Sequence, residues 1–368
     1  MTSIPLVDLA AQHAAVADEV AAGWREVLAA TAFIGGPQVA AFERAYAEFV
    51  GVPHCVGTGN GTDAIEIALR ALGIGQGDEC ILPANTFIAT AEAVARAGAT
   101  PVLVDCADDD TYLIDDDAVA AAVTPRTAAI IPVHLYGQAA PVERLSPLAK
   151  RTGAWVVEDA AQAHGARRDG KGAGSLGDVA ATSFYPGKNL GAYGDAGAVL
   201  TGSSAVADRM RMIADHGSPA KYRHEVLGVN SRLDTLQAVV LSAKLRRLAA
   251  WNAARRVAAA RYDDLLSGCE AVTRPRTLDG NEHVWHLYTV RVPDRDRILK
   301  ELQAGGIGAG IHYPVPVHLT PAFADLGYAE GAFPVAERSA RELLTLPLFA
   351  EITEAQQERV AEVLMAAL

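Results

Sequence analysis

Short apolar runs that alternate with amphipathic stretches through the first two thirds of the chain constrain its fold most. Several runs have the length and unbroken apolar character of buried strands, and they occupy residues 79–83, 100–105, 128–133, 155–159, 180–184 and 197–201. Helix-like stretches lie between them, as at residues 64–72 and 89–97. Strands that are buried on both faces are typical of a mostly parallel sheet. The pattern therefore predicts an α/β protein whose mostly parallel sheet is covered by helices in three layers.

The pattern changes near residue 234, where a long helical segment rich in Ala, Leu and Arg begins and continues to about residue 266. The residues after it predict one strand and two helices, over 286–292, 295–303 and 354–368. A length of 368 residues also favours two domains over one. We predict a large domain over residues 1–250, including the N-terminal segment, and a smaller C-terminal α+β domain over residues 251–368.

Charge and composition exclude several classes of function. Asp and Glu number 44 against 32 Lys and Arg, and the formal net charge of −12 repels nucleic acid and anionic lipid surfaces. No apolar stretch is long enough for a membrane span, and no export signal is recognisable. The four cysteines are far apart and form no CxxC pair, so neither a zinc site nor a disulfide framework is indicated. We expect a cytoplasmic protein with no nucleic-acid or membrane partner.

Two acidic clusters, at residues 108–110 and 115–117, raise the question of cation binding. They lack the glycine and the spacing of a calcium loop, and the ten histidines show no metal-ligand spacing. Solvated turns are the favoured interpretation of both clusters. We therefore predict no metal site.

Three motifs could bind or react with a ligand. Residues 57–64 form a glycine-rich turn before a predicted helix, where amides and a threonine hydroxyl could face an anion. Glu158 and Asp159 end an apolar strand, at the edge where α/β sheets bind ligands, and Asp159 is the better candidate. Lys188 follows a strand that contains Ser183, and small residues around it leave room for a bulky partner on its amine. Each motif alone has an ordinary alternative: a tight turn, a strand end or a solvent-facing lysine.

Together the three motifs match the requirements of one cofactor, pyridoxal 5'-phosphate (PLP). This cofactor needs a lysine that binds its aldehyde covalently, an acid that keeps its ring nitrogen protonated, and amide and hydroxyl donors for its phosphate. Phe87 could supply a ring face, and Gln162 could supply a donor to the phenolic oxygen. The combination predicts a PLP enzyme, although no single motif does.

Motifs distributed over nearly the whole chain are similar to those of a known family. They are GNGTDA at 59–64, PANTF at 83–87, HLYGQ at 134–138, EDAAQAHG at 158–165, SFYPGKNLG at 183–191 and GVNSRLD at 228–234. In this order they resemble the DegT/DnrJ family of nucleotide-sugar aminotransferases. The resemblance implies the PLP-dependent transferase fold of the aspartate aminotransferase type.

The resemblance also implies a role for each matching residue. Lys188 would bind the cofactor covalently, Asp159 would pair with its ring nitrogen, and Gln162 would contact its phenolic oxygen. The other cofactor contacts implied in the same subunit are Gly61, Thr62 and Ser183 at the phosphate and Phe87 against the ring. Asn230 would reach the phosphate site of the neighbouring subunit, which implies a homodimer with shared active sites. Some relatives carry histidine in place of the lysine and act as dehydratases, and Lys188 argues against that branch.

By resemblance, the chain is expected to transfer an amino group from L-glutamate to a nucleotide-linked keto-sugar, in deoxyamino-sugar biosynthesis. Residues 185–195 are similar to those that C-3 aminotransferases carry around the lysine. The favoured reaction therefore converts a dTDP-3-keto-6-deoxyhexose to a dTDP-3-amino-3,6-dideoxyhexose. Three alternatives stay open: amination at C-4 of a dTDP- or GDP-4-keto-6-deoxyhexose, amination of a cyclitol, and a non-catalytic PLP-binding or regulatory protein.

Several residues are candidates for substrate contacts. They are Tyr185, His216, Lys221, Tyr222, His312, Tyr313 and His318. Three of them, His216, Lys221 and Tyr222, precede Asn230 and could contact the nucleotide pyrophosphate across a dimer interface. His312 and His318 have an alternative as core residues, and Lys221 has one as a solvated surface charge.

Overall fold

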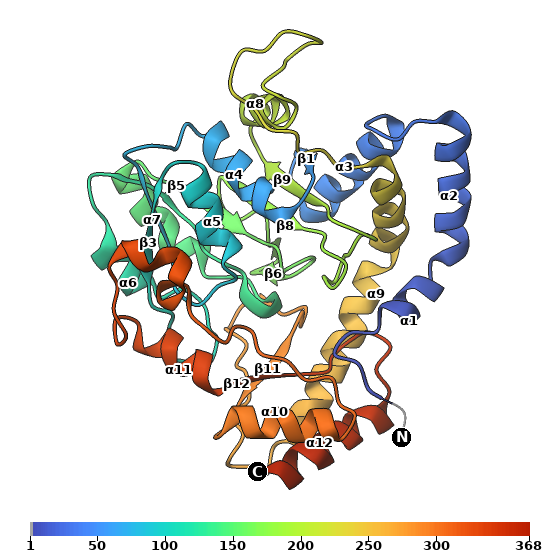
Figure 1. Cartoon of the computed structure of the whole chain (residues 1–368), viewed down its shortest axis with the longest axis vertical. Coiled ribbons are helices and arrows are strands. Elements are labelled where there is room, and N and C mark those ends of the chain that lie inside the picture. Colours follow the sequence, from blue (N-terminus) through green and yellow to red (C-terminus); the bar gives the residue numbers. More distant parts are fainter. Residues whose placement is uncertain (1–2) are drawn as a thin grey trace.

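The computed structural model describes residues 3–368 and is built around a seven-stranded sheet with the strand order β1-β9-β8-β5-β4-β2-β3 (Figure 1). The strands are β1 (His54–Thr58), β2 (Glu79–Pro83), β3 (Thr100–Val104), β4 (Thr127–Ile130), β5 (Trp155–Asp159), β8 (Val179–Ser183) and β9 (Gly197–Thr201). Strand β9 runs antiparallel to both of its neighbours, and the other adjacent strands are parallel. The predicted mostly parallel sheet is confirmed.

Helices cover both faces of this sheet. One face packs against α4 (Gly61–Ala71), α5 (Ala89–Arg96) and α8 (Ser204–Ala214), and the other against α3 (Pro37–Val50), α6 (Asp116–Ala122), α7 (Val142–Thr152) and α9 (Thr235–Leu265). Successive residues of one strand face opposite layers, so Ile81 and Leu82 of β2 are fully buried in different apolar clusters. The unbroken apolar strands of the sequence are explained by this burial on both faces.

A smaller α+β part lies around the C-terminal half of α9, at the lower end of the molecule in Figure 1. It contains the antiparallel pair β11 (Tyr288–Arg291) and β12 (Leu343–Leu346), with α10 (Arg295–Ala304), α11 (Pro334–Glu342) and α12 (Glu354–Ala367). Tyr262, Val290 and Val360 belong to its core, whereas Val317 and Phe323 pack into the core of the large sheet. Because α9 is continuous across residue 250, the division into 1–250 and 251–368 remains a proposal.

The N-terminal segment links the two parts. Ile4 forms a β-bridge with Ile307, and α1 (Leu9–Ala14) and α2 (Ala17–Ala30) follow along α9. The remaining short strands are β6 (Arg167–Arg168), β7 (Lys171–Gly172) and β10 (Asn281–Glu282), which form a small sheet of their own. Within residues 3–368, no helix combines the length and the apolar character that crossing a bilayer requires.

Candidate active site

A cavity of about 600 Å³ opens at the carboxyl ends of β5 and β8, beside the start of α4. This volume and this place in an α/β sheet are typical of small-molecule sites. The predicted site residues that line it are Gly61, Thr62, Phe87, Asp159, Gln162, Ser183, Tyr185, Lys188, His312 and Tyr313. The fold thus brings together three motifs that are more than 120 residues apart at their extremes.

Lys188 lies on the loop after β8, where its backbone N–H donates to the carbonyl of Tyr185 at 2.9 Å. Burial lowers the pKa of the Lys188 amine to about 8, and the nearby Asp159 carboxylate opposes this shift. At pH 7 about one such amine in ten is neutral, far more than for an exposed lysine. A neutral amine is the form that attacks an aldehyde, so the site favours covalent chemistry at Lys188.

Asp159 ends β5 with its carboxylate held by two hydrogen bonds. The hydroxyl of Thr90 donates to Oδ2 at 2.7 Å, and the N–H of Ala161 donates to Oδ1 at 3.1 Å. Thr86 Oγ1 lies 2.9 Å from Thr90 Oγ1 and continues the network. Among residues 3–368, no basic side chain forms an ion pair with Asp159 by direct contact, so its charge is available to a cation inside the cavity.

The start of α4 and the end of β8 approach each other closely at Gly61. A Cβ atom at this position would lie 2.5 Å from Ser183 Cβ, which no real contact tolerates. Asn60 caps the helix by accepting a hydrogen bond from the N–H of Asp63 at 2.8 Å, and Thr62 adds a hydroxyl at the first turn. Free amides at the N-terminus of an eleven-residue helix, together with two hydroxyl groups, fit a phosphate.

Aromatic and amide side chains complete the cavity wall. The ring of Phe87 is half exposed, with its centroid 5.5 Å from that of Tyr313. Gln162 accepts a hydrogen bond from the N–H of Tyr136 at 2.6 Å, so its amide nitrogen points the other way and donates to the Tyr313 hydroxyl at 2.9 Å. The lysine, the carboxylate, the phosphate cradle and the exposed ring together fit PLP.

Other predicted site residues lie outside this cavity. His318 is buried and bonded through Nε2 to Glu337 at 3.0 Å, which favours its alternative as a core residue. The remaining ones are His216, Lys221, Tyr222 and Asn230, in the segment that projects away from α8 at the top of Figure 1. Tyr222 is 85% exposed there. The structure therefore does not bring this group to the cavity of the same chain.

Several residues of the cavity wall were not predicted from the sequence. Leu6 and Val7 close it from the N-terminal segment, Asp195 from the loop before β9, and His286 and Leu287 from the residues before β11. No motif marks Leu6 or Val7, because backbone pairing with the smaller part of the chain places them there. His286 is a polar residue at the head of an apolar run, and this run predicts only a strand.

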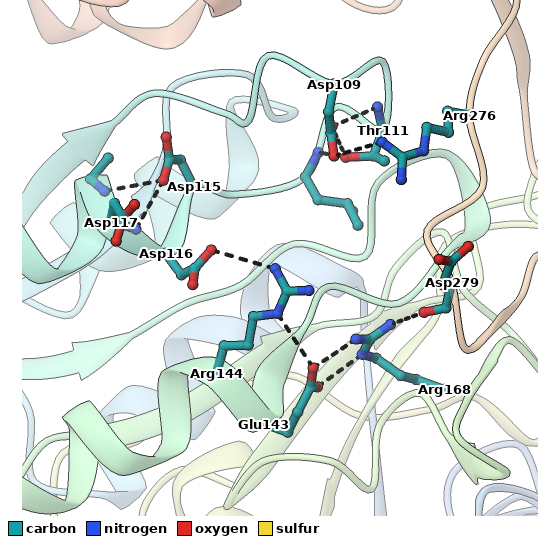
Figure 2. A network of polar contacts seen from close by, with 12 residues as sticks. Asp109, Thr111, Asp115, Asp116, Asp117, Glu143, Arg144, Arg168, Arg276 and Asp279 are labelled. Atoms are coloured by element: carbon teal, nitrogen blue, oxygen red, sulfur yellow. Dashed lines mark hydrogen bonds and ion pairs between the residues drawn. The ribbon is translucent and has the colours of Figure 1, made fainter.

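The two acidic clusters serve as caps and ion-pair partners (Figure 2). Asp115 accepts hydrogen bonds from the N–H groups of Asp117 and Ala118 and thereby caps α6. Asp109 accepts from the N–H of Thr111 at 3.1 Å, and Asp116 lies 3.8 Å from Arg144. In the part of the chain that the structure describes, no group of three or more His, Cys, Asp or Glu side chains has the arrangement of a metal site.

Comparison with known proteins agrees with this geometry. The model of the DegT/DnrJ/EryC1/StrS aminotransferase family matches residues 15–365. A "pleiotropic regulatory protein" of Geobacillus stearothermophilus is 48% identical over 98% of this chain and 97% of its own length. The dTDP-3-amino-3,4,6-trideoxy-alpha-D-glucose transaminase of Streptomyces venezuelae is 46% identical over 98% of this chain and 94% of its own.

Solved structures extend the similarity to the cofactor. The crystal structure of DesV from S. venezuelae in complex with a ketimine intermediate superposes with a TM-score of 0.97 at 45% identity, covering 100% of this chain and 98% of DesV. The PLP form of the putative sugar aminotransferase Spr1654 from Streptococcus pneumoniae superposes with a TM-score of 0.89 at 25% identity, covering 100% and 99%. The chain is therefore a PLP-dependent sugar aminotransferase that belongs to the DegT/DnrJ/EryC1/StrS aminotransferase family.

Proposed function

We propose that this enzyme aminates C-3 of a dTDP-linked 3-keto-6-deoxyhexose with L-glutamate as the amino donor. The observation that carries the proposal is near-complete coverage by a relative whose name places the new amino group at C-3 of a dTDP-linked sugar. A relative at 47% identity is named as a 3-aminotransferase of a UDP-linked sugar, and one at 39% as a GDP-perosamine synthase. The position of amination is thus better supported than the nucleotide base.

PLP, when bound, accepts the electrons that remain after a proton leaves the α-carbon of the amino donor. Asp159, fixed by Thr90 and Ala161, would stabilise the positive charge on the ring nitrogen. Lys188 would hold the cofactor through Nζ, and once a substrate amine has displaced it, the same nitrogen would accept the α-proton and pass it to the cofactor. Its lowered pKa, about 8, suits both directions of this transfer near neutral pH.

The remaining cavity residues bind and orient. Gly61, Thr62 and Ser183 would hold the phosphate at the start of α4. Phe87 would pack against the ring. The amide nitrogen of Gln162, which donates to the Tyr313 hydroxyl in this structure, would donate to the phenolic oxygen of bound PLP. Tyr185, His312 and Tyr313 line the same cavity, and we propose them as sugar contacts.

The functional unit that we propose is a homodimer with shared active sites. Asn230, His216, Lys221 and Tyr222 do not line the cavity of their own chain, and Tyr222 and Leu227 are 85% and 88% exposed. Contacts of this segment with the partner's cofactor phosphate and nucleotide would use these residues. The four cysteines are free thiols, which fits the reducing cytoplasm that we propose as the compartment.

Separate half-reactions test the proposal. Adding L-glutamate to the PLP-loaded enzyme should shift the cofactor absorption to that of the pyridoxamine form, and a dTDP-3-keto-6-deoxyhexose should reverse the shift and yield the 3-amino product. Turnover of only 4-keto isomers, GDP-linked sugars or cyclitols would select those alternatives. A cofactor spectrum that does not respond to any amino donor would instead support a non-catalytic, regulatory protein.

A further inference from the structure

Buried amide and imidazole side chains form a continuous network beside Lys188. Asn252 of α9 donates from Nδ2 to the backbone carbonyl of His164 at 2.8 Å. Asn189 donates from Nδ2 to Asn252 Oδ1 at 3.0 Å and to the backbone carbonyl of Val284 at 2.9 Å. Asn189 Oδ1 lies 3.2 Å from Nδ1 of His286. The network thus joins the residue after Lys188 to a histidine of the cavity wall.

Two backbone carbonyls fix the direction of every hydrogen bond in this network. A carbonyl only accepts, so the nitrogen atoms of both asparagine amides must face the carbonyls of His164 and Val284. Asn189 then presents its oxygen to His286, and Nδ1 of His286 must carry the proton. In the neutral ring, the other nitrogen, Nε2, keeps a free lone pair and can only accept.

His286 stays neutral and turns this acceptor toward the cavity. Its ring lines the same cavity as Lys188 and Asp159 while only 8% of the residue is exposed. Burial and the nearby positive charge of Lys188 lower the pKa of His286 well below its ordinary value. Nδ1 is hydrogen-bonded to Asn189, and this is the one side-chain hydrogen bond that His286 forms with residues 3–368. The cavity therefore contains a fixed acceptor that lacks its donor.

We propose that Nε2 of His286 is a sugar-specific contact that accepts a hydrogen bond from a hydroxyl on the carbon next to the aminated one. An acceptor selects a donor, and a 3-keto-6-deoxyhexose carries hydroxyl groups beside its carbonyl. L-glutamate has no hydroxyl, and its one donor group, the ammonium, is consumed in the reaction. The place of His286 beside Lys188 and Asn189 puts the acceptor close to the reacting carbon. This inference rests on the proposed function.

Two substitutions separate the two nitrogen atoms of the ring. In H286N the side-chain amide can still donate to Asn189 Oδ1, but no acceptor replaces Nε2 in the cavity. In H286Q the longer amide reaches the place of Nε2 and restores an acceptor there. H283N is the matched control, because His283 is equally buried, also neutral and three residues away, but does not line the cavity.

The half-reactions are measured separately by rapid-mixing absorbance, with L-glutamate for the first and a dTDP-3-keto-6-deoxyhexose for the second. Loss of one hydrogen bond predicts that H286N raises the half-saturating sugar concentration about 10-fold while the value for glutamate changes less than about 2-fold. H286Q should recover most of the loss, and H283N should leave both half-reactions unchanged. Calorimetry with cofactor-free protein and the 3-amino sugar nucleotide should show the same order of affinities.

Other outcomes overturn the inference. Equal slowing of both half-reactions by H286N would assign His286 to positioning Lys188, and an unchanged sugar half-reaction would remove it from recognition altogether. If the half-saturating sugar concentration of H286Q is as high as that of H286N, the hydrogen-bond acceptor at the place of Nε2 is not needed for sugar binding. If the wild-type enzyme responds to glutamate but to no keto-sugar, the proposed function is contradicted instead. The wild-type measurement comes first, so this outcome is seen before any variant is compared.

Discussion

At the scale of single residues, burial of the Lys188 amine lowers the stability of the folded chain and increases the fraction of the reactive neutral amine. Its pKa is about 8 in the folded chain and near 10.5 when unfolded, so the unfolded state binds more protons between these values. The destabilisation is fully present below pH 8 and is lost as the pH rises to 10.5. The two pKa values differ by about 2.5, and one pKa unit corresponds to 1.36 kcal/mol, so K188M should stabilise the cofactor-free protein by roughly 3 kcal/mol at pH 7.

Denaturant unfolding of both proteins at pH 7, 9 and 10.5 measures this difference, which should shrink at each step. The control is K171M, because Lys171 is exposed and its removal should change the unfolding free energy little. A difference between K188M and wild type that does not depend on pH would contradict a lowered pKa.

Thr90 supports the charge of Asp159 through one hydrogen bond to Oδ2. T90V keeps the shape of the side chain but removes the donor, so the carboxylate should bind a cationic ring nitrogen in a less fixed position. Loss of a hydrogen bond to a charged group predicts about a 10-fold weaker affinity for PLP, measured by absorbance titration of cofactor-free protein. T90S retains the hydroxyl and should bind PLP nearly as wild type does; equal affinity of T90V and wild type would exclude this role.

At the scale of elements, the phosphate cradle depends on how closely α4 meets β8. G61A adds a Cβ atom 2.5 Å from Ser183 Cβ, so the helix start and the strand end must separate. Overpacking of this kind costs about 1–3 kcal/mol of unfolding free energy, and the displaced amides should also weaken PLP binding. Thermal unfolding and a PLP titration measure the two effects. G202A is the control, because a Cβ atom there meets no neighbour, and an equal effect of both substitutions would contradict the role of close packing.

Strands were predictable where burial alone dictates them. Trp155–Asp159 and Gly197–Thr201 have the bounds expected from their apolar runs. Strand β1, His54–Thr58, was not predicted, because HCVGT has no continuous apolar run and its extended form rests on pairing with β9, from His54 opposite Thr201 onward. A strand whose conformation depends on a partner distant in sequence leaves little local signal.

The same distinction applies to the site. Lys188 and Asp159 stand in recognisable local motifs, and the structure places both in one cavity. The hydrogen-bond partners around them are distant in sequence. Thr90, which donates to Asp159, precedes it by 69 positions. His286, which is bonded to the residue after Lys188, follows Asn189 by 97 positions. Within the sequence, Thr90 belongs to a predicted helix and His286 to a predicted strand. Only the folded chain shows that each contacts the site.

At the scale of the whole molecule, binding of anions must overcome a net charge of −12. The long-range field disfavours both the phosphate of PLP and the diphosphate of a nucleotide sugar. Short-range donors at the start of α4 offset it for the first anion. For the second, the cavity of a single chain has Lys188 as its one lysine or arginine among the described lining residues, and we propose that this amine binds the cofactor. The basic group for the diphosphate must therefore come from elsewhere, and Lys221 of a second chain is the candidate that we propose.

Mixed dimers test whether active sites are shared between chains. In K188M the cofactor cannot be bound covalently, and N230D places a negative charge where the partner's cofactor phosphate is expected, so each homodimer should be inactive. Random pairing makes half of the dimers hybrids, and in each hybrid one of the two sites combines Lys188 from one chain with Asn230 from the other. Co-refolding equal amounts should therefore restore about a quarter of the wild-type rate. If purified hybrids carrying two different affinity tags stay inactive while N230D alone is also inactive, Asn230 acts within its own chain.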